Sequence, residues 1–326
     1  MKIIGNEVVN MPWEEKPKDC EQVFWRSDKN PILTKKDVPY ANSIMNSAVV
    51  PFEGGFAGVF RVDDTTRWPN MYAGFSEDGV KWDIEKTPIQ WIKTNPEIND
   101  FEYGYDPRVC KIDDTYYITW CNNHEGPTIG MAYTYDFKEF HQMENAFLPE
   151  NRNGVLFPRK IDGKYMMLSR PIGYERERNI FISQSPDLEY WGRHRLALKP
   201  ASNWDNVKIG AGPTPIETDE GWLIIYHGVV KSCNGSIYCI GSAILDLEKP
   251  WIVKYRADRF VMSPEEMYER VGDVGNVIFP CALLVDAPTG RVTMYYGCAD
   301  TVVGMAFTYV DDLIAFTKEH DIINRI

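Results

Sequence analysis

The stretch "FEYGYDPRVCKIDDTYYITWC" (residues 101–121) places Asp106 between an aromatic residue and a proline, at the head of an alternating apolar run. No obvious acidic partner stands beside it. Such a carboxylate can act as a general acid in catalysis, or it can cap its own strand through an Asx-turn. The residue type and its setting therefore leave both roles open.

A second group of residues could bind a small anion. Arg152 and Arg170 lie in the phrases "NRNGVLFPRK" and "MLSRP", Lys208 opens "KIGAGP", and His227 lies in "IIYHGV". Arginine binds a dianion such as phosphate through two parallel hydrogen bonds, and lysine contributes a point charge. Because the chain has a formal charge of −12, any anion that it binds must meet a local basic cluster of this kind.

Several of these residues also have a purely structural interpretation. Arg61 and Arg170 could close salt bridges between neighbouring sheets, His227 could be a satisfied core histidine, and Asp300 in "GCADT" could cap a turn. A buried polar group without a partner costs about 1 to 3 kcal/mol, so polar residues inside apolar phrases need partners or a purpose. Whether the fold brings them together decides between the two interpretations.

An internal repeat predicts the elements that position these residues. A small residue, a Ser, Thr or similar residue, an aspartate and then an aromatic recur in five phrases: "GFSEDGVKW", "AYTYDFKEF", "ISQSPDLEYW", "SAILDLEKPW" and, more loosely, "AFTYVDDLIAF". Ahead of each phrase lie two alternating strands joined by a turn of Asp, Gly, Glu or Asn, as in "LFPRKIDGKYMMLSR". Each repeat therefore predicts a small antiparallel sheet.

The aspartates of the five phrases lie 51 to 65 residues apart, and repeats of this length that are built from four strands are typical of propeller blades. The sequence predicts an all-β fold, a five-bladed β-propeller that forms a single domain over residues 1–326, with a short C-terminal helix in "YVDDLIAFTKEHDII". Two stacked β-sandwiches are the alternative. In a propeller the inner strands surround one axis, so residues at matching points of the repeat meet. The polar residues predicted to meet there are Asn46, Ser47, Arg61, Asp106, Asn122, Arg152, Asn153, Arg170, Lys208, His227, Asn276 and Asp300.

The composition excludes several other classes of protein. The net negative charge argues against a nucleic-acid surface, and no run of 18 apolar residues or N-terminal apolar segment indicates a membrane span or a signal peptide. We therefore expect a cytoplasmic protein with no nucleic-acid or membrane partner. The seven cysteines lack any CxxC spacing, and no HExxH motif occurs, so no disulfide framework, metal or organic cofactor is indicated. The N-terminal segment and the C-terminal helix suggest a homo-oligomer.

At this point the phrases resemble glycoside hydrolase family 130, the inverting β-mannoside phosphorylases, which are five-bladed propellers. The resemblance runs from "PWEEKP" and "NSAVVPF" through "YGYDPRVC", "NRNGVLFPRK", "LSRP" and "KIGAGP" to "IYHGV", "FPCA" and "YYGCADT", so it covers almost the whole chain. It implies that the partners are a β-linked mannose disaccharide or oligosaccharide and inorganic phosphate, the latter as co-substrate with no further cofactor.

The resemblance also implies roles for individual residues. Asp106 of "YDPRV" is the implied catalytic acid. The implied phosphate ligands are Asn46, Ser47, Arg152, Arg170, Lys208, His227 and Tyr238. The residues expected to contact the sugar are Arg61, Asp64, Tyr103, Asn153 and Asp300.

Phosphorolysis gives a reason for a solitary acid. Inverting hydrolysis needs a second carboxylate about 6.5 to 9.5 Å from the acid to activate water, whereas phosphate is already an anionic nucleophile that needs positioning. The resemblance implies that the proton passes from the aspartate through the 3-hydroxyl of the sugar to the glycosidic oxygen, giving α-mannose 1-phosphate and a shortened sugar. The alternatives are a mannosidase that uses water, with Asp63 or Asp64 as its base, and a sugar-binding propeller without catalysis.

One stretch departs from the family pattern. Members that act on β-1,4-linked mannosides continue after "SRP" with a His-Thr-Pro-Phe-Gly-Asp loop that helps to hold the acceptor sugar, but this chain reads "IGYERERNIF". We therefore expect β-1,2-mannobiose or short β-1,2-mannooligosaccharides as substrates, with β-1,4-mannooligosaccharides or mannosyl-glucose and mannosyl-GlcNAc compounds as the alternative. Candidate acceptor contacts in the loop, unless it is only a solvated surface, are Tyr174, Glu175, Arg176 and Arg178.

Overall fold

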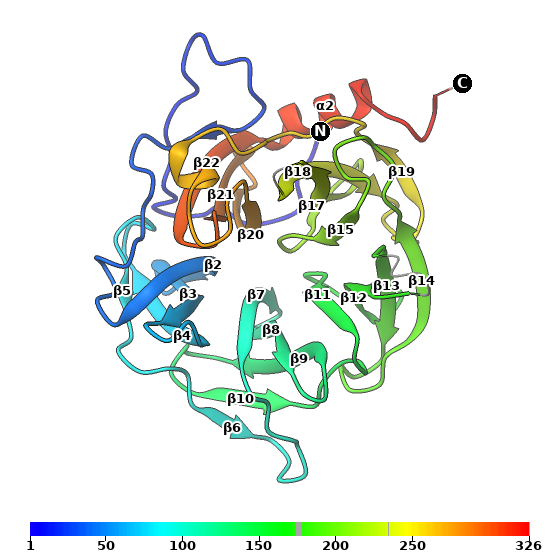
Figure 1. Ribbon diagram of the computed structural model, residues 1–326. Coiled ribbons are helices and arrows are strands. Elements are labelled where there is room, and N and C mark those ends of the chain that lie inside the picture. Colours follow the sequence, from blue (N-terminus) through cyan, green and yellow to red (C-terminus); the bar gives the residue numbers. More distant parts are fainter. Residues whose placement is uncertain (174–177, 234, 326) are drawn as a thin grey trace.

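The computed structural model describes residues 1–173, 178–233 and 235–325, and it shows five β-sheets arranged in a ring around a central axis (Figure 1). This arrangement confirms the predicted five-bladed β-propeller and excludes the stacked sandwiches. A helix, α2 (Val310–Glu319), follows the last strand as predicted. Within the described ranges, no helix has the length and apolar character needed to cross a membrane.

The first three blades are each built from strands that follow one another in the chain. From the axis outward, the first blade consists of β2 (Ala41–Phe52), β3 (Gly55–Asp64), β4 (Pro69–Ser76) and β5 (Asp83–Ile84). The second consists of β7 (Gly104–Ile112), β8 (Thr115–Asn123), β9 (Pro127–Thr134) and β10 (Phe140–Met143), with β6 (Trp91–Lys93) added in parallel at its outer edge. The third consists of β11 (Asn151–Leu156), β12 (Tyr165–Pro171), β13 (Ile180–Ser185) and β14 (Gly192–Leu198).

The last two blades depart from this pattern. The inner edge of the fourth is divided between β15 (Lys208–Ala211) and β16 (Ile216–Thr218), which both pair with β17 (Gly221–Ser232), and β18 (Gly235–Leu245) and β19 (Val253–Arg256) follow. A short helix, α1 (Met267–Arg270), precedes the fifth blade. The fifth contains β20 (Ile278–Asp286), β21 (Arg291–Cys298) and β22 (Val302–Tyr309), and its outermost strand is β1 (Trp25–Arg26) from the N-terminal segment. The ring is thus closed within one sheet, which combines β1 from near the N-terminus with the last three strands of the chain.

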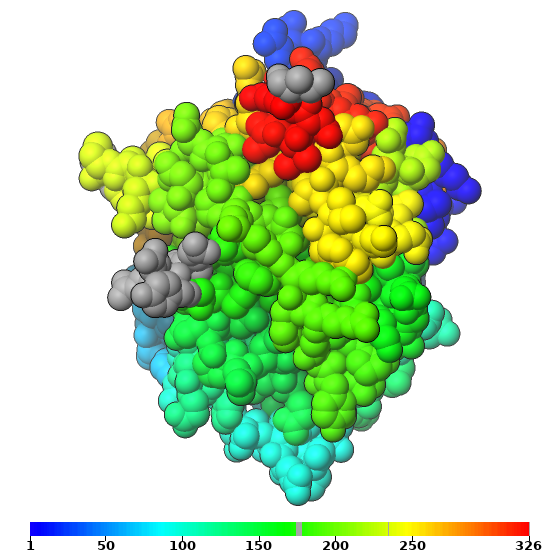
Figure 2. Space-filling model, turned by 90° about the vertical axis from the view of Figure 1, so that its right-hand side faces the viewer, coloured from blue at the N-terminus to red at the C-terminus, as the bar shows by residue number. Residues whose placement is uncertain are grey.

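The C-terminal segment also covers the edge of the fourth blade. Asp321 forms a bridge with Ala257, and the N–H of Ile322 donates to the carbonyl of Arg256 at 2.9 Å. Figure 2 shows this segment lying against the residues that follow β19. Leu313 and Ile314 of α2 are buried, so the helix packs on the propeller through these side chains.

The repeated aspartate stabilises the turn before the fourth strand of a blade. Asp78, Asp136, Asp187 and Asp246 each accept hydrogen bonds of 2.8 to 3.1 Å from the backbone N–H groups two and three residues later. Asp311 instead lies in the first turn of α2. The fifth phrase starts a helix because β1 already supplies the fourth strand of its blade.

The hydrophobic core lies between neighbouring blades. The central strands pack on both faces, so seven of the eight residues of β21 are buried. Five large clusters of buried apolar side chains fill the spaces between the five pairs of neighbours. In one of them, Ile182 of the third blade packs with Trp222 of the fourth. This packing leaves the axis to polar side chains.

Candidate active site

A repeated backbone irregularity turns polar residues toward the axis. In the inner strands of the first three blades, the register with the neighbouring strand shifts at a β-bulge. One residue of each bulge has φ in the left-handed region: 50° at Asn46, 53° at Asp106 and 54° at Asn153. Asn and Asp tolerate this conformation better than most residues because their short polar side chains can form local hydrogen bonds. Three successive blades thus present equivalent side chains to the axis.

All five blades contribute to one small cavity at the axis. It brings together most of the predicted site residues, from Asn46 on β2 to Asp300 in the turn after β21. The lining residues are Asn46, Arg61, Tyr105, Asp106, Cys121, Arg152, Asn153, Arg170, Lys208, His227, Tyr238, Val274, Val277, Phe279 and Asp300.

Three of the predicted phosphate and sugar contacts do not line the cavity, and neither do Asn122 and Asn276, which were also predicted to meet at the axis. Ser47 is fully buried, and its hydroxyl has no hydrogen-bond partner in the described part of the chain. Asp64 accepts hydrogen bonds from the N–H groups of Thr66 and Trp68 at 2.7 and 3.1 Å, so it caps the turn between β3 and β4. Tyr103 packs edge-on against Trp68, with ring centroids 5.2 Å apart. Contacts of these three residues with a ligand stay predictions.

The charged loop after β12 is described only in part. Tyr174, Glu175 and Arg176 lie outside the described residues. Arg178 is described, and its backbone carbonyl accepts a hydrogen bond from the N–H of Ile209 at 3.2 Å. Its positive charge contributes to a lowered pKa at Lys208, so the loop acts on the site electrostatically.

The carboxylate of Asp106 is held by side chains of the first blade. Asn46 Nδ2 donates to Oδ1 of Asp106 at 2.6 Å, and Arg61 Nη1 donates to the same oxygen at 3.1 Å. Arg61 is itself fixed by two hydrogen bonds to Asp63, at 2.8 and 2.9 Å. Burial alone would lower the pKa of Arg61, but attraction to Asp106 and Asp63 outweighs burial and raises it. Asp106 therefore bonds to side chains rather than to the backbone N–H groups of an Asx-turn.

The third and fourth blades supply a group of cations around a neutral histidine. Arg170 Nη1 lies 3.0 Å from His227 Nε2. Burial lowers the pKa of His227 well below its usual value, and the charges of Arg170, Lys208 and Arg108 lower it further. A guanidinium can only donate, so Nε2 accepts and the proton of the neutral ring lies on Nδ1.

No carboxylate among the described residues lies at ion-pair distance from Arg152, Arg170 or Lys208. Burial, with repulsion from Arg152 and Arg178, lowers the pKa of Arg170 to about 10. Burial also lowers the pKa of Lys208 to about 8, followed by repulsion from its cationic neighbours. In the described part of the chain, Arg152 Nε, Arg170 Nε and His227 Nδ1 are buried without a hydrogen-bond acceptor. A dianion in the cavity would accept these bonds and relieve the repulsion.

Two glycines allow polar side chains to approach closely. A Cβ atom at Gly297 would lie 1.9 Å from Asn46 Oδ1, and one at Gly210 would lie 2.4 Å from His227 Cε1. Both positions must therefore lack a side chain if the acid and the basic group are to keep their places. The sequence offered no basis for choosing these two glycines.

Asp300 is a second carboxylate of the cavity. Burial raises its pKa to about 6; Arg61 opposes this shift, and repulsion from Asp106 and Asp63 adds to it. A raised pKa means that the folded state binds the proton more tightly than the unfolded chain does. The ionised side chain therefore destabilises the fold increasingly as the pH rises from about 4 through about 6.

We expect Asp300→Asn to stabilise the protein. A shift from 3.8 to about 6 corresponds to about 3 kcal/mol, so the free energy of unfolding at pH 8 should rise by about that amount. The gain should shrink below pH 6 and vanish near pH 4. Urea titrations across this range measure it. Asp162→Asn is the matched control, because Asp162 has a similar φ of 50° but is exposed; equal effects of both substitutions would contradict the prediction.

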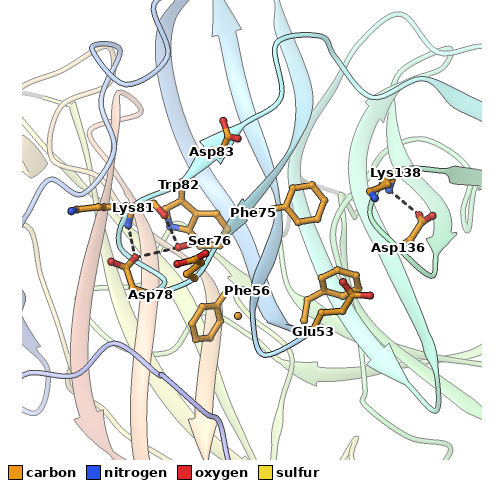
Figure 3. A pocket seen from close by; sticks show the side chains of 13 residues that line it. Glu53, Phe56, Phe75, Ser76, Asp78, Lys81, Trp82, Asp83, Asp136 and Lys138 are labelled. Carbon is orange, nitrogen blue, oxygen red and sulfur yellow. Dashed lines mark hydrogen bonds between the residues drawn. The ribbon is translucent and has the colours of Figure 1, made fainter.

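A larger surface hollow of about 890 Å³ lies beside the first two blades, at the β2–β3 turn. Figure 3 shows Phe56, Phe75 and Trp82 around it, with Glu53 at its edge. No predicted site residue lines it, and its Asp78 is one of the turn aspartates of the repeat. The axial cavity is therefore the candidate site. Across the described residues, no cluster of three or more His, Cys, Asp or Glu side chains is arranged to hold a metal ion.

A comparison with known families decides where the chain belongs. The family model described as beta-1,4-mannooligosaccharide phosphorylase, that of glycoside hydrolase family 130, matches residues 7–319. The chain belongs to glycoside hydrolase family 130. This membership confirms the resemblance and the prediction of a phosphorylase-type enzyme.

Individual relatives within family 130 are named for different linkages. The chain is 57% identical to the beta-1,4-mannooligosaccharide phosphorylase of Ruminococcus albus, over 98% of both chains. It is 31% identical to the 1,2-beta-oligomannan phosphorylase of a Thermoanaerobacter species, over 88% of this chain and 97% of the relative. The solved complex of beta-1,2-mannobiose phosphorylase from Listeria innocua with beta-1,2-mannobiose matches with a TM-score of 0.80 at 26% identity, covering 90% and 99% of the two chains. The expectation of β-1,2-linked substrates is thus less well supported than its β-1,4 alternative.

Some cavity residues escaped the sequence reasoning. Tyr105 and Cys121 are neighbours of predicted positions on β7 and β8, while Val274, Val277 and Phe279 belong to or precede the fifth inner strand. The alternation of the strands could have indicated the first two. Nothing in the apolar phrase "VGNVIFPCA" marks which of its residues reach the axis.

Proposed function

We propose that this protein catalyses the inverting phosphorolysis of β-1,4-linked mannosides, giving α-mannose 1-phosphate and a sugar shortened by one mannose. The observation that supports this most strongly is the content of the axial cavity. One carboxylate, Asp106, is oriented by Asn46 and Arg61, and the same cavity contains cations that have no anionic partner among the described residues. An acid and a dianion site in one cavity are the two requirements of phosphorolysis.

We assign the acid role to Asp106 and the binding of phosphate to the basic group. Arg152, Arg170 and His227 each offer a buried N–H group that has no acceptor in the part of the chain that the structure describes, and Lys208 adds a charge beside Tyr238, 4.9 Å from the ring centroid. Phosphate held there would attack the anomeric carbon while Asp106 protonates the leaving oxygen, through the 3-hydroxyl of the sugar as the family resemblance implies. Further proposed phosphate ligands are Asn46 and Ser47, and proposed sugar contacts are Arg61, Asp64, Tyr103, Asn153 and Asp300.

A water-using mannosidase is less well supported. It would need a free carboxylate as base, but Asp63 is bound by Arg61 through two hydrogen bonds and Asp64 caps a turn. The carboxylate of Asp300 is attracted by Arg61 and repelled by Asp106. We propose that it binds hydroxyl groups of the sugar. The cations around His227 would attract phosphate to the place that a hydrolytic water requires.

The β-1,4 linkage is proposed from the relative of 57% identity, since that level over 98% of both chains far exceeds the similarity to the relatives named for β-1,2 linkages. We also propose that residues 1–326 act as one catalytic domain, because β1 near the N-terminus completes the last blade. The cytoplasmic location and the homo-oligomeric state stay predictions.

Product analysis tests the proposed function. The protein is incubated with β-1,4-mannobiose, β-1,4-mannotriose or β-1,2-mannobiose, each with and without phosphate, and mannose 1-phosphate and free mannose are quantified. We expect mannose 1-phosphate from the β-1,4 substrates only when phosphate is present. Release of mannose independent of phosphate would favour the hydrolase, turnover of β-1,2-mannobiose alone would overturn the linkage, and no turnover would favour a binding protein.

The pH dependence of kcat/KM for phosphate should reflect the ionisation of the Lys208 side chain. Its pKa of about 8 means that its charge is present below pH 8 and is lost above it, so kcat/KM for phosphate should fall as the pH rises through about 8. In Lys208→Arg the guanidinium stays charged, and this fall should move to higher pH. The comparison of the two profiles cancels the titration of phosphate itself. An unchanged basic limb in the variant would exclude Lys208 as its source.

A further inference from the structure

The acid of the site has an unusually demanding backbone. Asn46 and Asn153 share its left-handed φ, but only Asp106 of these three bulge residues precedes a proline. Proline restricts the residue before it to extended conformations, because its ring crowds the preceding backbone. The positive φ of Asp106 is therefore disfavoured both because the residue is not glycine and because a proline follows it. Such a conformation needs support from the surrounding structure.

Arg108 supplies contacts at this point. Its Nη1 donates to the carbonyl of Asp106 at 3.2 Å and to the carbonyl of Pro107 at 2.9 Å. The first carbonyl belongs to the peptide bond between Asp106 and Pro107, and the second belongs to the peptide bond that follows Pro107. The side chain of Arg108 thus fixes the backbone that aims the carboxylate.

The same guanidinium reaches two other blades. Nε donates to the carbonyl of Gly212 in the fourth blade at 2.6 Å, and Nη2 donates to the carbonyl of Pro280 in the fifth at 3.4 Å. The ring of Phe279 lies over it, with its centroid 5.2 Å from Cζ. The acid-bearing strand is thereby joined across the axis to the fourth blade, which carries Lys208 and His227, and to the fifth blade.

Arg108 is buried as an unpaired charge. It is 2% exposed, and within the described ranges no carboxylate lies at ion-pair distance from it. Arg256, the comparable buried arginine of the fourth blade, is instead paired with Asp205 at 2.6 Å. Burying a charge without a counter-ion is costly, so carbonyl dipoles and an aromatic face must stabilise Arg108. Its charge also helps to keep His227 neutral.

We propose that Arg108 is a positioning residue for phosphorolysis: it holds the strained backbone of Asp106 and sets the distance between the acid and the fourth blade, which carries the proposed phosphate ligands Lys208 and His227. This inference rests on the proposed function. Arg108 contacts no substrate in this scheme and acts through Asp106. A displacement of about 1 Å at a reacting group can cost about 100-fold in rate, so loss of the four carbonyl contacts should lower kcat by about that factor.

The test is a double-mutant cycle in the complete protein. Arg108→Lys keeps the charge but cannot form the four contacts, and we expect kcat to fall about 100-fold, with the KM values for mannoside and phosphate changing far less. In the Asp106→Asn background the same substitution should cost little more, because the residue through which it acts is already impaired. Arg256→Lys is the control, expected to lower the melting temperature while kcat stays at the wild-type level.

The outcomes separate this inference from the proposed function. Absence of mannose 1-phosphate from the wild type would defeat the proposed function itself. With an active wild type, an unchanged kcat in Arg108→Lys, or the same fold-loss in both backgrounds, would overturn the positioning role. Arg108→Gln, which removes the charge, is used if the lysine variant does not fold; if neither variant folds, Arg108 is a residue for folding and the proposal is wrong.

Discussion

Asp106→Asn is expected to lower kcat for phosphorolysis by about 10²- to 10⁴-fold, the usual contribution of a general acid. The amide can still accept the hydrogen bonds from Asn46 and Arg61, but it cannot give a proton to the sugar. Asparagine also adopts the left-handed φ of 53° as readily as aspartate does. The fold and the binding of phosphate should therefore persist while the chemical step fails.

The control for Asp106→Asn lies on the same hairpin. Asp113, in the turn between β7 and β8, has a φ of 54° and is exposed, so Asp113→Asn makes the same chemical change at the same backbone conformation away from the axis. Its kcat should equal that of the wild type. Initial rates of mannose 1-phosphate formation measure both variants.

A substrate with a better leaving group sharpens this test. The need for protonation falls as the leaving oxygen becomes less basic, so the loss caused by Asp106→Asn should be smaller with a 4-nitrophenyl β-mannoside than with mannobiose. An equal loss with both substrates would indicate that Asp106 positions the sugar. A variant that retained most of its activity toward mannobiose would remove Asp106 from the acid role.

The convergence of the site could be predicted because a repeat converts sequence position into spatial position. Once Asp106, Arg170 and His227 were assigned to matching strand starts and ends, the symmetry of the propeller required them to meet. The prediction did not need any single strand boundary to be correct. It needed only the number of blades and the order of strands within one.

Finer features depended on backbone geometry that the repeat does not encode. Asp63 and Asp64 are adjacent on β3, so they point to opposite faces of the sheet, and the pattern gave no means of choosing the one that meets Arg61. The β-bulge in β7 shifts its register with β8 by one residue between Tyr105 and Arg108, and the repeat gives no sign of this shift. Closure by β1 was equally hidden, because the two residues Trp25 and Arg26 form too short a strand to show a pattern.

The cavity also explains why its polar groups do not behave like a stabilising salt-bridge network. Asp300 and Lys208 both have pKa values shifted toward their neutral forms by burial. Groups arranged for stability would instead have pKa values shifted toward the charged form by pairing. The folded protein thus carries unfavourable electrostatic energy in this cavity that a sugar and an anion would relieve, which is a common property of binding sites.

Arg170→Met should abolish the response to phosphate without destabilising the protein. Arg170 is buried among like charges, and burial lowers its pKa to about 10, so its charge is unfavourable in the folded state. Methionine fills a similar volume without that charge. The melting temperature of the variant in the absence of phosphate should therefore equal or exceed that of the wild type.

The gain in stability on adding phosphate should differ between the wild type and Arg170→Met. At a phosphate concentration about 100 times its dissociation constant, the wild type gains about 2.7 kcal/mol of stability, which raises its melting temperature, whereas Arg170→Met should gain less than about 1 kcal/mol. Loss of a buried charge-assisted contact costs about 2 to 5 kcal/mol, so kcat/KM for phosphate should fall about 30-fold to several thousand-fold.

The matched control is Arg159→Met, an arginine in the connection between β11 and β12 that pairs with Glu217 at 2.7 Å away from the cavity. Arg159→Met removes a favourable ion pair, so it should lower the melting temperature slightly and leave the response to phosphate intact. The reverse pattern, with phosphate stabilising Arg170→Met as strongly as the wild type, would show that the anion binds elsewhere. The buried cations at the axis would then need another explanation, because no anionic side chain among the described residues neutralises Arg170.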